Sequence, residues 1–179
     1  MKLIDTPLKD VFIIENFYAE DNRGTFVKTL HQSTFEQNGL EAKFKESFFS
    51  VNKKGVIRGM HFQTPPEDHV KLVYCNAGSL VDVILDLRKS SPTYGKSFAI
   101  ELSGNNFRSV YIPKGFAHGF ETLEDNTIMT YLTSTEHAPQ QDNGILFNSF
   151  NHAWKTAEPI LSVRDKNFPS LNNFKSPFL

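Results

Sequence analysis

Residues 69–88 read HVKLVYCNAGSLVDVILDLR and predict two strands joined by a tight turn. Apolar and β-branched side chains fill both arms, and Asn76-Ala77-Gly78-Ser79 supplies the residues that hairpin turns favour. Residues 50–63, 95–123 and 126–137 have the same character, with a second turn at Ser103-Gly104-Asn105-Asn106. Strand signals recur about every 8 to 12 residues without helical patterns between them, which favours a sandwich or barrel.

The rest of the chain is less periodic. One short helix is expected at residues 33–39, with Ser33 or Thr34 as its N-cap and Gly39 just past its end. Beyond Asn148 we expect an irregular tail wrapped over the barrel and anchored by aromatic side chains, namely Trp154, Phe168, Phe174 and Phe178. The length suits one domain spanning residues 1–179.

Composition excludes several classes of function. With 19 basic and 20 acidic side chains the net charge is −1, so no general field attracts nucleic acid or an anionic membrane. The single cysteine, Cys75, permits no internal disulfide and lies in an apolar run, so it is expected to face a core. No stretch reads as a signal peptide or a membrane span, which predicts a cytoplasmic protein. No G-x-G-x-x-G fingerprint suggests a redox cofactor, and none is expected.

Two histidine segments carry the chemistry: GVIRGMHFQ at residues 55–63 and PKGFAHG at residues 113–119. Together they resemble the two signature motifs of the cupin superfamily, which lie on neighbouring strands and point their histidines inward. The resemblance implies an all-β cupin jelly-roll barrel with short peripheral helices and an irregular C-terminal tail. Two satisfied core histidines are the alternative, but burying two ionisable rings in one small barrel is costly without a task.

Many cupins bind a metal through His-x-His, a following Glu and the second-motif histidine. This chain offers His61, Glu67 and His118, but Gln63 stands where the middle histidine belongs. Because an amide is a poor ligand for such metals, we expect no metal site.

A longer pattern is more specific. The segments DNRGTF (21–26), GVIRGMHFQ (55–63), KLVYCNAGSLVDVILDLRKSSPTYG (71–95), YIPKGFAHGF (111–120) and LSVRD (161–165) occur in one order. This pattern resembles the dTDP-4-dehydrorhamnose 3,5-epimerase family over roughly residues 1–170. The resemblance implies an isomerase that inverts carbons beside the ketone of a nucleoside-diphosphate-linked 4-keto sugar, for use in a surface polysaccharide such as capsule or lipopolysaccharide.

The resemblance also implies catalytic roles. A C–H beside a ketone needs a placed base, stabilisation of the enolate oxygen, and a second group that reprotonates the opposite face. His61 would be the base with Asp165 as its carboxylate partner, and Tyr131 the acid. Lys71 and His118 would lie near the ketone oxygen. Each role has an alternative. Lys71 could be a surface lysine, Tyr131 an ordinary barrel aromatic, and Asp165 only a turn residue.

Substrate-binding residues follow from the same resemblance. Arg58 and Arg23 would clamp the diphosphate, because the guanidinium fork bonds two phosphate oxygens. The Arg23 segment would come from a partner subunit, which predicts a homodimer. Phe26 would line the base pocket, and Gln63 is placed in the substrate site.

The chain departs from the family pattern at the nucleotide end. Lys28, Glu46 and Phe48 stand where the family usually has Glu, Gln and Asn. The Glu46 carboxylate could accept two adjacent N–H groups of guanine, whereas thymine offers one, so we expect GDP first and dTDP second. His137 replaces a usual Tyr and could determine which carbon is epimerised or admit a heptose.

Three other functions remain open at this stage. One is a nucleotide-sugar 3,4-ketoisomerase and another is a non-catalytic sugar-nucleotide-binding cupin. The third is a metal-dependent cupin oxygenase or isomerase.

Overall fold

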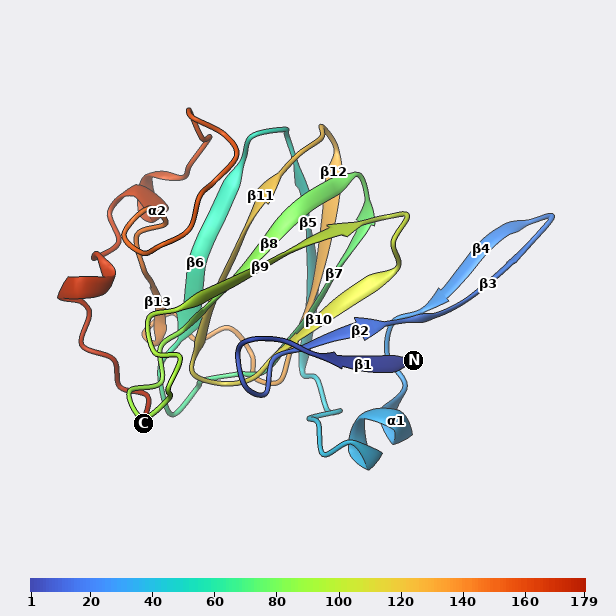
Figure 1. Cartoon of the computed structure of the whole chain (residues 1–179), viewed down its shortest axis with the longest axis horizontal. Helices are drawn as coiled ribbons and strands as arrows, with labels where there is room; N and C mark the ends of the chain where they lie inside the picture. The colour runs from blue at the N-terminus through green and yellow to red at the C-terminus, as the bar shows by residue number, and fades with distance from the viewer.

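The computed structural model describes all 179 residues and consists mainly of antiparallel strands (Figure 1). The six-stranded sheet contains, in spatial order, β1 (Lys2–Asp5), β2 (Phe12–Glu15), β10 (Arg108–Ile112), β7 (Lys71–Ala77), β12 (Thr127–Thr133) and β5 (Glu46–Asn52). The five-stranded sheet contains β13 (Asp142–Gly144), β6 (Ile57–Gln63), β11 (Phe116–Thr122), β8 (Ser79–Asp86) and β9 (Ser97–Ser103). The two sheets face each other, so the predicted all-β jelly-roll architecture is confirmed.

Strand β8 shows how the barrel is stabilised. All eight of its residues are buried, because both faces of the strand are covered. Leu80 and Ile84 point into the core between the sheets, whereas Val83 and Leu85 join a second core that includes Phe178 of the C-terminal tail. Alternate side chains of a strand point to opposite faces, so one apolar strand supplies two cores. Cys75 belongs to the first core, as expected.

The two histidine motifs lie on neighbouring strands. Strands β6 and β11 pair antiparallel, and His61 lies directly opposite His118. Across a strand pair such residues are side by side on one face, so the two imidazoles share the barrel interior.

The C-terminal tail is irregular, as predicted, and packs on the outer face of the five-stranded sheet. It contains α2 (Val163–Lys166) and the 3-10 turn η1 (Leu171–Asn173). Trp154 and Phe174 pack against the second core, and Phe178 is buried in it. Figure 1 shows this tail, in orange and red, beside β6 and β13.

The predicted N-cap of the first helix is wrong. Helix α1 spans Gln32–Gln37 and its N-cap is His31, two residues before Ser33 and three before Thr34. The Thr34 hydroxyl is hydrogen-bonded to the His31 ring at 2.8 Å, so it does not cap the backbone. Gly39 follows the helix with φ +71°, as the predicted C′ residue requires.

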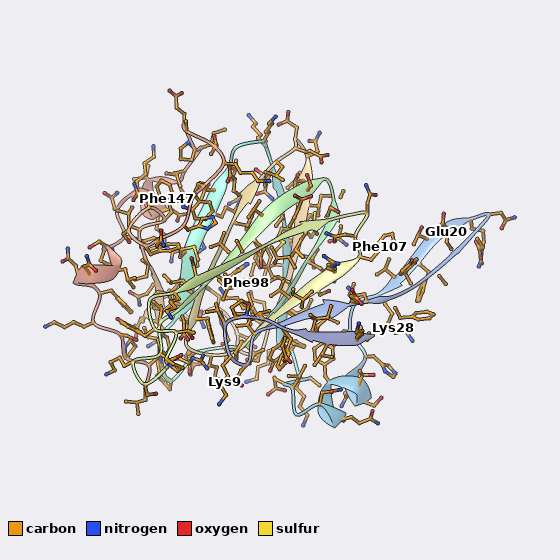
Figure 2. The ribbon with its side chains drawn as sticks, viewed as in Figure 1. Lys9, Glu20, Lys28, Phe98, Phe107 and Phe147 are labelled. Carbon is orange, nitrogen blue, oxygen red and sulfur yellow. The ribbon has the colours of Figure 1, made fainter.

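Strands β3 (Phe17–Asp21) and β4 (Gly24–Lys28) form a hairpin that projects from the barrel (Figure 1). Glu20 and Lys28 mark this hairpin in Figure 2. Phe17, Tyr18 and Phe26 are each more than half exposed on it. The helices of this chain are all too short to span a lipid bilayer.

The segment DLRKSSPT, part of the family-like pattern, serves the fold. The Asp86 side chain is fully buried and accepts hydrogen bonds from the Arg88 guanidinium and from the Ser91 and Thr93 hydroxyls. Burial raises the pKa of Asp86, but these hydrogen bonds outweigh it and hold the pKa below its usual value. The segment therefore fixes the loop after β8 rather than contributing to the pocket.

Candidate active site

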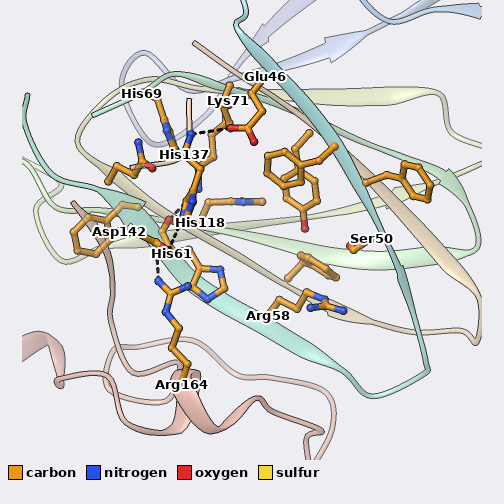
Figure 3. Close-up of a pocket in the computed structure, with 17 residues that line it drawn as sticks. Glu46, Ser50, Arg58, His61, His69, Lys71, His118, His137, Asp142 and Arg164 are labelled. Carbon is orange, nitrogen blue, oxygen red and sulfur yellow. Dashed lines mark hydrogen bonds and ion pairs between the residues drawn. The ribbon is translucent and has the colours of Figure 1, made fainter. Parts of the chain in front are cut away.

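A cavity of about 470 Å³ opens between the two sheets (Figure 3). Strands β5, β6, β7, β11 and β12 line it, together with the loops near residue 69 and residue 137 and with Arg164 from α2. Of the thirteen predicted site residues, nine line this cavity in the single chain: Glu46, Phe48, Arg58, His61, Gln63, Lys71, His118, Tyr131 and His137.

His61 forms a pair with Asp165. Its Nε2 lies 2.9 Å from Asp165 Oδ1, and Asp165 Oδ2 accepts the Gly59 N–H at 3.1 Å. Burial opposes ionisation of Asp165, but the bonds from His61 and Gly59 outweigh it and hold its pKa below the usual 3.8. An ionised carboxylate only accepts, so Nε2 donates to Asp165, and in the neutral ring the lone pair is on Nδ1. The His61 side chain is 30% exposed, which leaves the ring accessible from the pocket.

A second histidine–aspartate pair lies deeper in the barrel. His118 Nε2 is 2.6 Å from Asp82 Oδ1, and both side chains are almost fully buried. Burial, with Asp82 opposing it, lowers the pKa of His118 below its ordinary value. His118 is therefore a neutral, fixed imidazole at neutral pH.

Lys71 is a buried lysine in the wall of the cavity. Its Nζ donates to the His61 carbonyl oxygen at 3.1 Å, and the residue is 9% exposed. Burial lowers its pKa to about 8, with Asp142 and Asp82 opposing the shift. Most Lys71 side chains therefore carry a charge at neutral pH, in a site where that charge is poorly screened.

Tyr131 approaches from the opposite sheet. It lies on β12, whereas His61 lies on β6, so the two side chains belong to facing walls of the cavity. Burial raises the pKa of Tyr131, with a hydrogen bond from Ser50 opposing it, so the phenol keeps its proton at neutral pH. Phe48 stacks on Tyr131, with ring centroids 4.7 Å apart at 16°.

Arg58 lies at the outer end of the cavity beside Ser50 (Figure 3). Its Nε donates to Asn52 Oδ1 at 2.7 Å, and Asn52 Nδ2 bonds the Ser50 carbonyl and hydroxyl. This contact uses only Nε, so the terminal guanidinium nitrogens remain available for an anion.

The rim near His137 is a connected polar network, with its bonds dashed in Figure 3. The His137 backbone N–H donates to Glu46 Oε2 at 2.9 Å, and its ring Nε2 lies 3.1 Å from Asp142. Arg164 Nη2 forms a 2.6 Å ion pair with the same Asp142. Glu46, His137, Asp142 and Arg164 are therefore held together by direct contacts.

Gln63 is present in the wall but its amide is occupied. Its Nε2 donates to the Glu67 carbonyl at 2.7 Å, and its Oε1 accepts the Ala138 N–H at 2.7 Å. The side chain joins two loops at the pocket mouth. No cluster of three or more His, Cys, Asp or Glu side chains has the geometry to hold a metal ion.

Four predicted residues do not line the cavity of the single chain: Asp165, which contacts His61 from behind the wall, and three residues of the hairpin. Arg23, Phe26 and Lys28 belong to the projecting hairpin β3–β4. The Arg23 guanidinium is paired there with Asp21 at 2.6 Å and is mostly exposed. In one chain these residues do not meet the cavity that holds His61.

Sequence reasoning missed several residues in or beside the site. Asp82 is the missed residue that the sequence could have revealed. It is an acidic residue inside the apolar strand VDVILD, and an isolated carboxylate in such a strand requires a partner. Asp142 and Arg164 gave no local signal, because only the fold brings the loop and tail together. His69 lines the pocket half-buried, and burial lowers its pKa to about 3.

Comparisons with known proteins identify the family. A family model described as dTDP-4-dehydrorhamnose 3,5-epimerase matches residues 5–173. The dTDP-4-dehydrorhamnose 3,5-epimerase of Shigella flexneri is 41% identical over 170 residues, covering 93% of this chain and 94% of its own length.

Two solved structures have the same fold. One is a dTDP-6-deoxy-D-glucose-3,5-epimerase from Legionella pneumophila in complex with dTDP-4-keto-L-rhamnose. It has a TM-score of 0.93 and 32% identity, over 97% of this chain and 94% of that chain. The other is a 3'-monoepimerase from Streptomyces bikiniensis in complex with dTDP-quinovose. It has a TM-score of 0.89 and 27% identity, over 93% and 86%. The chain therefore belongs to the dTDP-4-dehydrorhamnose 3,5-epimerase family, whose members are isomerases acting on nucleotide sugars.

Proposed function

We propose that this protein epimerises a nucleoside-diphosphate-linked 4-keto sugar at C3, C5 or both, with His61 as the base. The observation that carries the proposal is the His61–Asp165 pair, which engages Nε2 and leaves Nδ1 without a bond to the carboxylate, in a cavity that also holds Lys71 and Tyr131. Family membership supports the reaction class.

Proton removal follows from the His61 pair. Asp165 holds the Nε2 proton and supports the positive charge that develops on the ring when Nδ1 takes a proton from the carbon. The electrons of the broken C–H bond move to the ketone oxygen, which becomes an enolate. The Lys71 ammonium is the buried positive charge placed to stabilise that oxygen, in a position where the charge is poorly screened.

Reprotonation is assigned to Tyr131. Because it projects from the sheet opposite His61, its phenol faces the other side of a sugar ring bound between them. The Tyr131 proton goes to the carbon as the carbonyl re-forms, which leaves the configuration inverted. The Ser50 hydroxyl supports the resulting phenolate, since its bond to Tyr131 favours the ionised form.

The nucleotide is proposed to be dTDP, with GDP as the second candidate, which reverses the order expected from the sequence. The Legionella and Streptomyces structures hold dTDP-linked sugars. Glu46 is the observation that favours GDP, because its carboxylate lines the pocket. One of its oxygens already accepts the His137 N–H, however, and this weakens a two-bond contact with guanine. Titration calorimetry with dTDP and GDP decides between them. Glu46→Gln is the matched variant, expected to shift preference toward dTDP if Glu46 reads the base.

The assembly is proposed to be a homodimer in which hairpin β3–β4 enters the partner's cavity. Exposed Phe17, Tyr18 and Phe26 on the hairpin support this, because side chains of this kind are usually covered. Arg23 would then join Arg58 at the diphosphate. Light scattering gives the mass. Mixing Arg23→Ala with His61→Asn subunits tests the shared site, since mixed dimers would regain one intact site.

Deuterium exchange tests the reaction itself. The protein is incubated with a 4-keto-6-deoxy sugar nucleotide in D2O, and NMR follows C3 and C5. We expect deuterium uptake and inversion at one carbon or both. Uptake at neither carbon would contradict the epimerase proposal, and a shifted carbonyl would indicate the ketoisomerase instead. His137→Tyr tests whether the rim residue affects the choice between C3 and C5.

A further inference from the structure

The His61 ring is held by only one hydrogen bond. Asp165 fixes Nε2, but a single bond leaves the ring free to tilt about the contact. The other side-chain ring against it is Phe168, which meets the imidazole edge-on with centroids 5.7 Å apart at 75°. Edge-to-face packing of this kind favours a defined mutual orientation. Phe168 lies three residues after Asp165, so one tail segment supplies both contacts.

Space for the Phe168 ring exists because residue 144 is glycine. Gly144 on β13 is the register partner of His61 on β6. A Cβ at position 144 would collide with the Phe168 ring, at about 2.3 Å from its nearest atom. Gly144 has no positive φ, so its role here is the absence of a side chain rather than its backbone conformation.

Arg164 contacts the Phe168 ring from another side. Its Cζ lies 5.2 Å from the Phe168 centroid, which is within range for a cation–π contact. The guanidinium is held in turn by the 2.6 Å ion pair with Asp142. Figure 3 shows Arg164 extending from the tail toward Asp142, beside His61. Imidazole, glycine backbone and guanidinium therefore surround one phenylalanine.

We propose that Phe168 is a positioning residue, which holds the His61 imidazole at the angle needed for proton removal, and that Gly144 makes this possible. The inference rests on the proposed function of His61. Its physical basis is that proton transfer requires the lone pair to point at the carbon, and a small displacement of a reacting group can cost orders of magnitude in rate. Phe168 does not line the cavity, so it acts through His61 rather than on substrate.

The first test is Phe168→Ala, compared with Phe147→Ala. Phe147 is a partly buried aromatic of the same tail that packs on Trp154 instead of His61. We expect Phe168→Ala to lower kcat about 10- to 100-fold, with KM within about twofold of wild type. Phe147→Ala is expected to keep kcat while losing comparable thermal stability. Unchanged kcat in Phe168→Ala, equal kcat losses in both variants, or a loss confined to KM would overturn the proposal.

The second test uses Gly144→Ala, which leaves every aromatic in place. The added methyl must displace the Phe168 ring, so we expect a similar loss of kcat. In the Phe168→Ala background the same substitution meets no ring and should cost nothing further, a non-additivity that a double-mutant cycle measures. Additive losses would overturn the proposal. A wild-type protein without turnover would defeat the proposed function itself, whereas an active wild type with unaffected variants would defeat this inference alone.

Discussion

Two histidines line the cavity, each bonded through Nε2 to an aspartate Oδ1, but the two pairs differ in burial and in how the fold assembles them. His118 and Asp82 come from the paired strands β11 and β8, and their side chains are 3% and 0% exposed. His61 comes from β6, while Asp165 comes from the tail 104 positions later, and the His61 side chain is 30% exposed. The barrel fixes the first pair completely. The second is assembled at the cavity wall by a separate segment, and there a ring can meet substrate. The difference assigns proton transfer to His61 and fixed support to His118.

Replacing each histidine in a separate variant gives the largest predicted contrast, between loss of activity and loss of stability. His61→Asn should lower kcat by roughly 10²- to 10⁴-fold, the range for loss of a general base, with little change in melting temperature because the ring is partly exposed. His118→Asn should lower the melting temperature clearly, since it leaves the buried Asp82 without its partner. Steady-state kinetics and thermal melts of both variants measure this. A larger kcat loss in His118→Asn would reverse the assignment of roles.

Replacing the carboxylate that bonds His61 tests why this histidine, and not His118, is the base. Asp165→Asn puts an amide beside Nε2, which can donate as well as accept and so admits the tautomer with the proton on Nδ1. We expect kcat to fall roughly 10- to 100-fold, as for other groups that orient an imidazole. Asp142→Asn is the control, because Asp142 contacts His137 and Arg164 rather than a His61 nitrogen. Equal losses in the two variants would show that charge near His61 matters and tautomer does not.

The two histidines could be predicted from local sequence, whereas their aspartate partners could not, and Asp82 was missed altogether. Both histidines and their shared face followed from two short motifs on adjacent strands, because strand pairing places matched registers side by side. Asp165 was found only through a family resemblance, since nothing local ties it to position 61. The projecting hairpin's strands and the contacts of Asp142, Arg164 and Phe168 were not predicted, because they depend on where loops and tail settle. The predicted helix cap was wrong because the Thr34 hydroxyl bonds to the His31 ring, and residue preferences at helix ends do not reveal such a contact.

Lys71 lines the same cavity as the two histidines, and its lowered pKa predicts an alkaline limit to activity. Burial lowers its pKa to about 8, so the ammonium is present below that pH and lost above it. If it stabilises the enolate, kcat should decline as pH rises through about 8. Lys71→Met should be slower at pH 7 and should lack that limb. If kcat of Lys71→Met still declined at alkaline pH, the decline would be due to another group.

His69 provides the smallest predicted effect, which is an acid limit on stability. It is a pocket histidine whose ring nitrogens contact no carboxylate, and burial with the nearby Lys71 charge lowers its pKa to about 3 from 6.5. Between these values the unfolded chain binds a proton that the folded chain does not, so stability falls as pH drops below about 6.5. His69→Gln removes this titration, and its melting temperature should therefore fall less than that of wild type between pH 7 and pH 4. A melting temperature that falls as much in His69→Gln as in wild type would assign this acid sensitivity to another group.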